Sequence, residues 1–315
     1  MSQAVFGVPI KRLKGTTVSM STTAAHLAIP AGYNQIRHSA QMPYRLGLAP
    51  RLSKVFYYDD TDGSYTDYTT QAIDGSSSTH VPLDAMPTAD FLYLGLETMT
   101  RGFYFDIGTN PNDQNRTLDV EYSYDASNGR YIKLTGTVSG ALTVGETVTG
   151  QTSATTATLV YGPAGSTYIV VKDADGTFLI GEDVDGASQT CDDLTAIAAE
   201  PAGTPYFTDV TGDSDGTDST GTLAVDGLYS FTLPTSLVAT VYGVSGLHWI
   251  RFAPSGSLGT TVDINEIIPA CSDTDYGYFD AGETYQYSFN NQKVGAIETD
   301  MVAGSAILEV TFIQY

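Results

Sequence analysis

Apolar and polar side chains alternate in short runs along this sequence, and turn-forming residues separate the runs. In "TLDVEYSYD" (117–125), Leu118, Val120, Tyr122 and Tyr124 alternate with polar neighbours. A period of two places every second side chain on one face of an extended strand, whereas a helix needs a period of about 3.6. The run therefore predicts a strand with one buried face.

Similar runs recur through most of the chain. The clearest span residues 54–60, 80–83, 89–96, 102–108, 221–234, 241–255, 260–270, 283–291 and 306–315. No amphipathic helical pattern lies between them, and the 32 Gly and 21 Tyr residues agree with turns and strands. We therefore predict an all-β fold, an antiparallel β-sandwich or jelly roll, with the last run covered on both faces.

A repeated pattern interrupts these runs. Residues 142–152 read "LTVGETVTGQT" and residues 178–188 read "FLIGEDVDGAS". Each copy leads from two apolar residues through Gly-Glu to a Val between polar neighbours, which indicates strand, tight turn and strand. We interpret Glu146 and Glu182 as equivalent turn residues rather than a catalytic pair. Two such units can bury an apolar face only by packing on each other, so we expect a small β domain.

The strand pattern on either side of the repeat continues as if the repeat were absent. We therefore predict that residues 135–202 form a domain inserted into a surface loop of one discontinuous sandwich, built from residues 21–134 and 203–315. Residues 1–20 are predicted to form an extended basic arm.

Charge is distributed unevenly. The net charge is -22, which argues against nucleic acid as a partner, yet no Asp or Glu precedes Asp59. The basic residues expected to bind a partner are Lys11, Arg12, Lys14, Arg37 and Arg45. A basic segment on an acidic chain indicates an interaction arm. The alternative is that this segment neutralises the protein's own acidic body.

The first copy of the repeat resembles small β units found in structural proteins of tailed bacteriophages. The matching residues are Gly145, Glu146, Val148, Gly150, Thr152, Ser153, Ala154, Thr156 and Ala157. The second copy keeps Gly181, Glu182, Val184 and Gly186 before it departs at "ASQTCDD". The flanking "LAIPAGYNQIRHS", "DGLYSFTLP" and "GLHWIRF" look like the jelly-roll or carbohydrate-module-like domains of phage head and tail proteins. The resemblance implies a virion protein.

The motifs of common enzymes and metal sites are absent from the sequence. The histidines are far apart, and no nucleophile elbow or phosphate-binding loop occurs, so we predict neither an enzyme nor a cofactor. Asp213, Asp215 and Asp218 share one Gly-rich loop and are weak Ca²⁺ candidates, since the Glu of a calcium-binding loop is missing. Cys191 and Cys271 are too few for a disulfide framework and are expected to be reduced packing residues.

Trp249 and Arg251 fall on the same face of the run "LHWIRF", in which alternate side chains point in opposite directions. An exposed aromatic face there would contact a glycan or a protein partner. The alternative is that this lone tryptophan belongs to the core of the sandwich.

These observations lead to one main functional expectation. The chain is expected to be a capsid decoration, or cement, protein that binds the outer head surface through its basic segment and stabilises the shell. Its partners would be the major capsid protein and neighbouring copies of itself, with a homotrimer implied by the resemblance. The expected location is the virion, assembled in the host cytoplasm, without membrane contact. The alternatives are a tail or baseplate receptor-binding protein that recognises a glycan, and a glycan-active enzyme.

Overall fold

The computed structural model describes residues 12–20, 25–29, 35–42, 44–76, 78–127, 130–201, 204–219, 221–234, 238–271, 277–279, 281–282, 284–288, 294–301 and 306–314. Strands hold 52% of the residues and helix 2%. The strands pair antiparallel in each of the described sheets. The prediction of an all-β, antiparallel sandwich fold is therefore confirmed.

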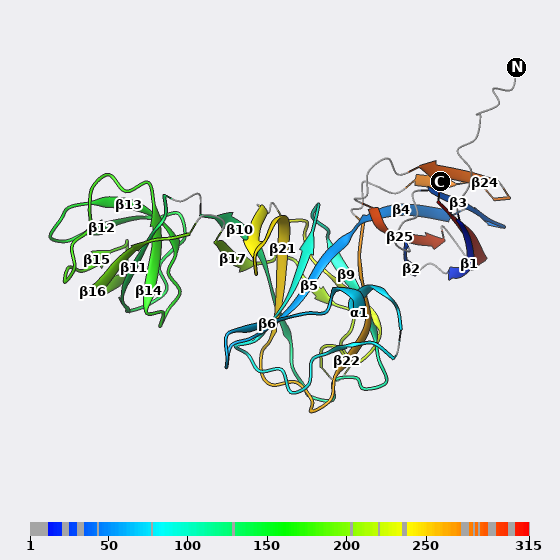
Figure 1. The fold of residues 1–315 in the computed structure, drawn as a ribbon, viewed down its shortest axis with the longest axis horizontal. Helices are drawn as coiled ribbons and strands as arrows, with labels where there is room; N and C mark the ends of the chain where they lie inside the picture. Colours follow the sequence, from blue (N-terminus) through cyan, green and yellow to red (C-terminus); the bar gives the residue numbers. More distant parts are fainter. Residues whose placement is uncertain are drawn as a thin grey trace, which may run out of the picture. The chain divides into compact units, whose positions relative to one another are not determined.

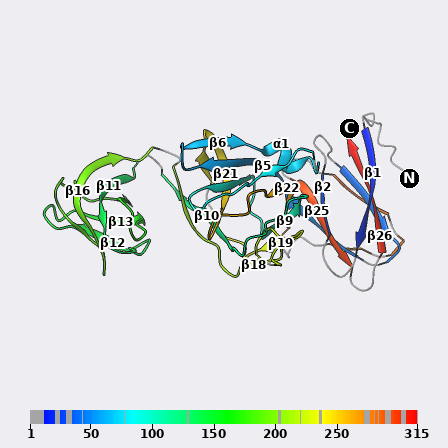
Figure 2. The same cartoon turned by 90° about the horizontal axis from the view of Figure 1, so that it is seen from below.

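Strands from both ends of the sequence form one sandwich, which we call the terminal module. Its strands are β1 (Arg12–Met20), β2 (Ala25–Ala28), β3 (Gln35–Ala40), β4 (Tyr44–Pro50), β23 (Gly277–Phe279), β24 (Thr284–Ser288), β25 (Val294–Met301) and β26 (Ala306–Gln314). They form two four-stranded sheets, ordered β1-β26-β3-β24 and β2-β25-β4-β23. Figures 1 and 2 show early strands in blue beside late strands in orange and red. Ile36, Tyr44, Ile297 and Leu308 are buried in its core.

The C-terminal strand β26 differs from its prediction. Leu308 and Val310 are buried, but Ile307 is 58% exposed and Glu309 is also exposed. Only one face of β26 is therefore covered in its described part, because the strand lies in an outer layer of the sandwich rather than between two layers.

A second pair of sheets forms the central module. Its elements are β5 (Leu52–Asp59), β6 (Ser64–Asp67), α1 (Thr69–Ile73), β7 (Val81–Pro82), β8 (Phe91–Leu96), β9 (Gly102–Ile107), β10 (Leu118–Ala126), β17 (Pro205–Asp209), β18 (Ser214–Asp215), β19 (Gly227–Ser230), β20 (Val238–Val241), β21 (Val244–Pro254) and β22 (Asp263–Pro269). One sheet has the order β17-β10-β21-β8-β5-β6 with β20 on β21, and the other has the order β18-β19-β9-β22-β7. Phe252 meets Phe103 and Phe105 edge to face in the core, at 5.7 and 5.6 Å between ring centroids.

The terminal and central modules correct the prediction of a single sandwich over 21–134 and 203–315. Each module has its own pair of sheets and its own buried cluster. The sequence pattern identified strands but not their partners, because alternation says which face is buried and not against which sheet.

The repeat region forms a closed six-stranded barrel. Its strands are β11 (Ile132–Val138), β12 (Thr147–Gly150), β13 (Thr156–Tyr161), β14 (Tyr168–Lys172), β15 (Val184–Asp185) and β16 (Thr190–Ala199). The ring runs β11-β14-β13-β12-β15-β16 and closes through the pairing of β16 with β11. Closure leaves no unpaired sheet edge in this small domain. The barrel spans 132–199, against the 135–202 expected for the inserted domain.

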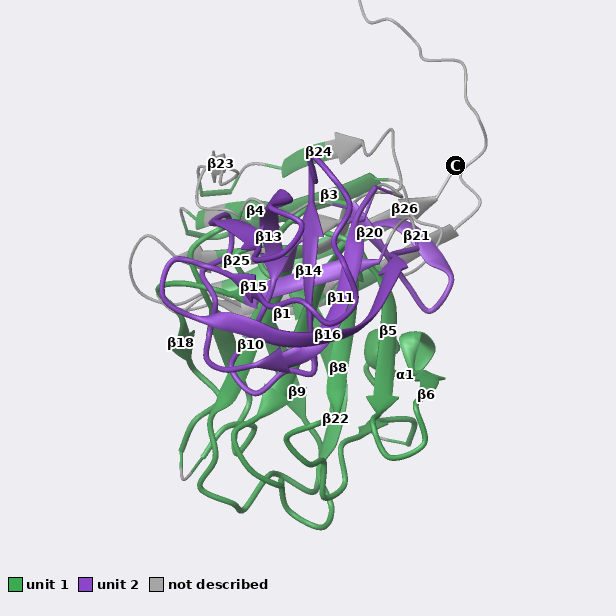
Figure 3. Ribbon diagram, turned by 90° about the vertical axis from the view of Figure 1, so that its left-hand side faces the viewer, with its two compact units in different colours: residues 1–122, 209–235, 248–315 green, residues 123–208, 236–247 purple. Residues whose placement is uncertain are grey.

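The modules follow one another in nested order along the chain. The terminal module is interrupted by the central module, which is itself interrupted by the barrel. The chain divides into two compact units, shown in Figure 3: residues 1–122, 209–235 and 248–315, and residues 123–208 and 236–247. The first unit holds the terminal module and most of the central module, and the second holds the barrel.

The two sequence copies are related by an approximate internal two-fold symmetry of the barrel. Shifting residue numbers by 36 turns β12 into β15, and the facing residues Thr149 and Asp185 are themselves 36 positions apart. Ile132 of β11 pairs with Val171 of β14. Adding 36 to the first number and subtracting 36 from the second gives Tyr168 and Thr135, and these two residues also pair. The repeat in the sequence is therefore a repeat of three-stranded halves that complete each other's barrel.

The Gly-Glu spacing that the two copies share has a direct structural cause. Gly145 and Gly181 adopt φ of +88° and +84° in equivalent turns, a conformation that other residues rarely adopt. The following glutamate turns back onto its own turn: Glu146 accepts the Thr143 N–H at 2.8 Å, and Glu182 accepts the Leu179 N–H at 2.6 Å. Both glutamates are thus structural turn residues, as the repeat predicts.

Each glutamate also accepts backbone hydrogen bonds from the other three-stranded half of the barrel. Glu146 accepts the N–H of Ala187, in the second copy, at 2.9 Å. Glu182 accepts the N–H groups of Thr152 and Ser153, in the first copy, at 3.0 and 2.8 Å. The glycine that ends each motif makes room for this exchange, since a Cβ on Gly150 would stand 2.7 Å from the Glu182 carboxylate.

Candidate functional site

The basic residues expected to bind a partner are built into the terminal module. Arg12 and Lys14 belong to β1, which pairs along its whole length with β26, from Arg12–Gln314 to Met20–Ala306. The prediction of an extended arm is therefore wrong for residues 12–20, because these residues find a strand partner within the chain. Lys11 lies outside the described residues.

Arg37 and Arg45 lie in different sheets, so the five basic residues are not gathered on one strand or one sheet. Arg37 is exposed on β3, while Arg45 is on β4 of the opposite sheet, in register with Asp300 of β25. Pairing of basic N-terminal strands with acid-bearing C-terminal strands favours the alternative that this segment balances charge within the protein.

Trp249 is fully buried and is not available to a ligand. Its ring stacks on Phe56, with 5.7 Å between centroids and 21° between planes. The core interpretation of this tryptophan is correct, although Trp249 lies on the outer side of the seven-stranded sheet, opposite the main core that holds Ile250 and Phe252.

The acidic loop after β17 shows ordinary turn chemistry. Asp213 accepts the Tyr229 hydroxyl at 2.8 Å, and Asp215 accepts the N–H and hydroxyl of Thr217 at 2.8 and 2.6 Å. Asp218 is exposed. Over the described ranges, no three His, Cys, Asp or Glu side chains gather closely enough to hold a metal ion.

The outer side of the seven-stranded sheet carries aromatic side chains on four neighbouring strands, β21, β8, β5 and β6. We call this surface the outer aromatic face; its members are Phe56, Tyr58, Tyr65, Phe91, Tyr93, Trp249 and Arg251. Tyr58 lies 4.8 Å from Tyr65 and 6.5 Å from Phe91 between centroids, and Tyr65 lies 6.0 Å from Tyr93. Tyr58, Tyr65 and Phe91 are half-buried, so part of each ring meets solvent.

Arg251 lies across this face and is fixed at three points. Its guanidinium is 4.0 Å above the Phe91 ring, its Nε donates to Glu121, and its Nη1 donates to the Tyr93 hydroxyl at 3.4 Å. Burial disfavours the charged form, but the bonds with Glu121 and Tyr93 outweigh it and raise the pKa of Arg251. The cation is therefore permanent and largely satisfied within the protein.

The phenol of Tyr65 is also held within the face. Burial, the neighbouring Tyr93 and Tyr58, and a hydrogen bond with Tyr93 raise the pKa of Tyr65. Tyr65, Tyr93, Arg251 and Glu121 thus form a polar chain that runs across the aromatic rings. The rings are held in one arrangement before any ligand arrives.

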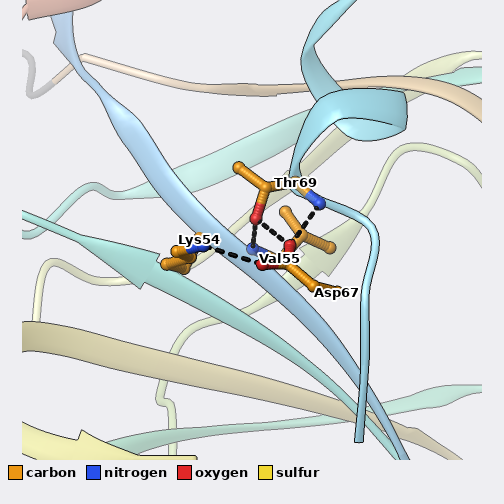
Figure 4. Close-up of polar contacts among 4 residues, drawn as sticks. All are labelled: Lys54, Val55, Asp67 and Thr69. Atoms are coloured by element: carbon orange, nitrogen blue, oxygen red, sulfur yellow. Dashed lines mark hydrogen bonds and ion pairs between the residues drawn. The ribbon is translucent and has the colours of Figure 1, made fainter. Parts of the chain in front are cut away.

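An ion pair closes the edge of the outer aromatic face. Asp67 accepts the Lys54 ammonium at 2.7 Å and the Thr69 N–H at 2.9 Å, and Thr69 Oγ accepts the Val55 N–H at 3.0 Å (Figure 4). Burial would raise the pKa of Asp67, but the bonds from Lys54 and Thr69 lower it. This network ties the β5–β6 hairpin to the start of α1.

The outer aromatic face was missed by sequence reasoning, although the runs contain a signal for it. In "KVFYYDD" and "ADFLYLGL", aromatic or aliphatic residues occupy consecutive positions, so both faces of β5 and β8 are apolar. A sheet with solvent on one side normally alternates with polar residues. Paired charges and fixed rings suit binding of a ligand rather than general acid-base chemistry.

Both cysteines lie in the interior of the structure, as expected for packing residues. Cys191 and Cys271 are buried, and burial together with Asp192 and Asp183 raises the pKa of Cys191 to about 11, which keeps it a thiol. In the described part of the chain, no helix has the length and apolar character needed to cross a bilayer.

Comparisons with known proteins assign this chain to no family, so it is classified by its fold. No family model matches the chain, and searches of curated proteins and of solved structures find no significant similarity. The class that the structure defines is an all-β antiparallel protein of nested modules. The resemblance of the repeat to phage structural proteins stays a prediction.

Proposed function

We propose that this chain is a structural protein of a bacteriophage virion, a capsid decoration protein attached through its terminal module. Its partners would be the major capsid protein and neighbouring copies of itself. The observation that carries the proposal is the pairing of β1 with β26, which brings Arg12 beside Gln314 and places both ends of the described chain in one sheet. A module that holds both ends can serve as the base for modules inserted into it.

Charge supports the same module as the attachment surface. Residues 12–50 contain four basic residues, Arg12, Lys14, Arg37 and Arg45, and no carboxylate, and the paired strands β25 and β26 add Glu298, Asp300 and Glu309. The described strands of the module are therefore close to neutral, whereas the chain as a whole has a net charge of -22. A locally less acidic surface on an acidic protein would dock to a negatively charged shell with the least repulsion.

A tail or baseplate receptor-binding protein is the second candidate, because the outer aromatic face offers rings to a ligand.

Substitution of Arg37 tests the attachment surface. Arg37 is exposed on β3, so Arg37→Glu should leave the fold intact and weaken binding to particles that lack the native protein about tenfold, more at low salt than at high salt. Binding is measured by co-sedimentation of purified protein with such particles.

The matched control is Arg130→Glu, which reverses another exposed charge, in the second compact unit. The control should bind normally. Equal losses in both variants would show a net-charge effect only, and undiminished binding of Arg37→Glu would remove β3 from the attachment surface. Electron microscopy of intact particles would locate the protein on the head or on the tail.

A further inference from the structure

The outer aromatic face presents rings where a sandwich normally presents polar side chains. Tyr58 of β5, Tyr65 of β6 and Phe91 of β8 occupy neighbouring outward positions, with Tyr58 in register with both Tyr65 and Phe91. Large aromatic side chains that meet solvent on a sheet face indicate a binding surface, because tyrosine offers both an apolar ring and a hydroxyl to a ligand.

The rings are held in place before binding. Tyr58 and Phe91 are 28° from parallel, and Tyr65 packs against Tyr58 on one side and Tyr93 on the other. Arg251 covers one side of Phe91 and is fixed by Glu121. A ligand that stacks on such rings loses less free energy to ordering side chains than one that meets a mobile surface.

The chemistry of this face fits a neutral sugar. A pyranose has a flat face of C–H groups and a rim of hydroxyls, which match aromatic rings bordered by hydrogen-bonding groups. The described cations at the border are already paired, Lys54 with Asp67 and Arg251 with Glu121. Asp60, which accepts the Tyr58 hydroxyl at 3.3 Å, adds a negative charge beside the rings and would repel an acidic ligand. The net charge of -22 would also repel acidic polysaccharides.

Aliphatic side chains are scarce on this face, which argues against a protein as the ligand. The outward positions of β5, β8 and β21 carry Lys54, aromatic residues, Gly95, Arg251 and Ala253, and the one large aliphatic side chain on the outward side of β21, Leu247, is only 9% exposed. The strongly exposed large apolar residues of the described chain, such as Ile180 and Val238, lie outside it. A protein interface of similar size would bury an apolar centre.

We propose that the outer aromatic face binds a neutral polysaccharide, with sugar rings stacked on Tyr58 and Tyr65. This activity is independent of attachment through the terminal module and would hold for a protein located on either head or tail.

Affinity electrophoresis of the full-length protein tests the proposal. Native gels contain hydroxyethyl cellulose, galactomannan or soluble starch, with heparin as the acidic comparison. We expect retardation by at least one neutral polysaccharide and not by heparin. Replacing both rings, in Tyr58→Ala/Tyr65→Ala, should weaken binding at least about tenfold, whereas Tyr58→Phe/Tyr65→Phe should retain most of it.

The matched control is Tyr242→Ala, which removes a tyrosine that is 60% exposed in the turn between β20 and β21. It should bind as the unchanged protein does. Trp249 is the single tryptophan and lies buried beside Phe56, so its fluorescence reports whether each variant retains the sheet.

Chemical protection gives a second measurement that does not depend on folding of a variant. Acetylation of tyrosines by N-acetylimidazole, mapped by mass spectrometry, should be slowed by the bound polysaccharide at Tyr58 and Tyr65 and unchanged at Tyr242. Three results would overturn the proposal: no retardation by any neutral polysaccharide, retardation that survives Tyr58→Ala/Tyr65→Ala in a folded protein, or protection absent at both tyrosines. Loss of particle binding in that variant, without polysaccharide binding, would assign the face to a protein partner.

Discussion

His38 is a buried histidine in the core of the terminal module. It is 1% exposed, its Nδ1 shares a 2.6 Å hydrogen bond with the Tyr44 hydroxyl, and its ring lies 4.9 Å from Phe279 and 5.9 Å from Tyr285 between centroids. Burial lowers the pKa of His38 to about 4.

The terminal module should therefore lose stability in mild acid. The pKa of His38 is depressed in the folded state, so the stabilisation is complete above about pH 6.5 and is lost as pH falls from there towards 4. The full effect is about 3 kcal/mol. Hydrogen exchange of peptides from β3 and β24, measured between pH 7 and pH 4.5 and corrected for intrinsic rates, should show this loss.

The control variant is His38→Phe/Tyr44→Phe, which removes the titrating ring together with its hydrogen-bond partner. Protection of β3 in this variant should depend much less on pH over the same range. If its acid dependence matches that of the unchanged protein, other groups cause the effect.

At the scale of elements, the repeated glutamates of the barrel offer a matched comparison. Glu182 is 3% exposed and accepts bonds from Leu179, Thr152 and Ser153, whereas Glu146 is half-buried and accepts two N–H groups. Burial would raise the pKa of Glu182, but these bonds outweigh it and lower the pKa. The stabilisation that the Glu182 carboxylate gives to the barrel is therefore present above about pH 4.5, the ordinary pKa of a glutamate, and is lost as pH falls through its lowered pKa.

Glu182→Gln should destabilise the barrel by about 2–3 kcal/mol, because an amide cannot accept the same set of N–H donors. The equivalent Glu146→Gln should cost about 1 kcal/mol. Denaturant unfolding of each full-length variant, followed by hydrogen exchange in β12 and β15, measures the difference. Equal effects would mean that burial does not distinguish the two copies of the motif.

At the scale of the whole molecule, the nested order predicts that the barrel can be removed. The strands that lead into and out of it meet at Ser127 and Thr204, where the Ser127 N–H donates to the Thr204 carbonyl at 3.0 Å. Replacing residues 128–203 by Asn-Gly should join β10 to β17 through a two-residue hairpin turn. The shortened chain should fold and keep Trp249 buried, as judged by its fluorescence.

The reciprocal experiment uses residues 130–201 alone. This fragment contains all six barrel strands and their buried cluster, so it should unfold cooperatively by itself. A red-shifted Trp249 emission in the shortened chain, or failure of the fragment to fold, would mean that the modules depend on each other.

The local sequence determined the strands, the turns and the inserted character of the repeat region, because these depend on residues close together in the chain. Alternation in 117–125 predicted β10, and Gly-Glu predicted the turns at Gly145 and Gly181. The terminal strand β26 was also expected, although its exposed face at Ile307 was not.

Only the tertiary structure decided which strands pair. The basic residues Arg12 and Lys14 were expected in an arm, and their partners in β26 lie about three hundred residues away, beyond the reach of any local pattern. The outer aromatic face likewise needs β5, β6, β8 and β21 to become neighbours, and it is this pairing that brings Phe56 into stacking contact with the buried Trp249. The alternation of apolar and polar residues determines which side chains of a strand share a face. Which strands lie beside that strand, and which sheet covers its face, depends on pairing between residues far apart in the chain.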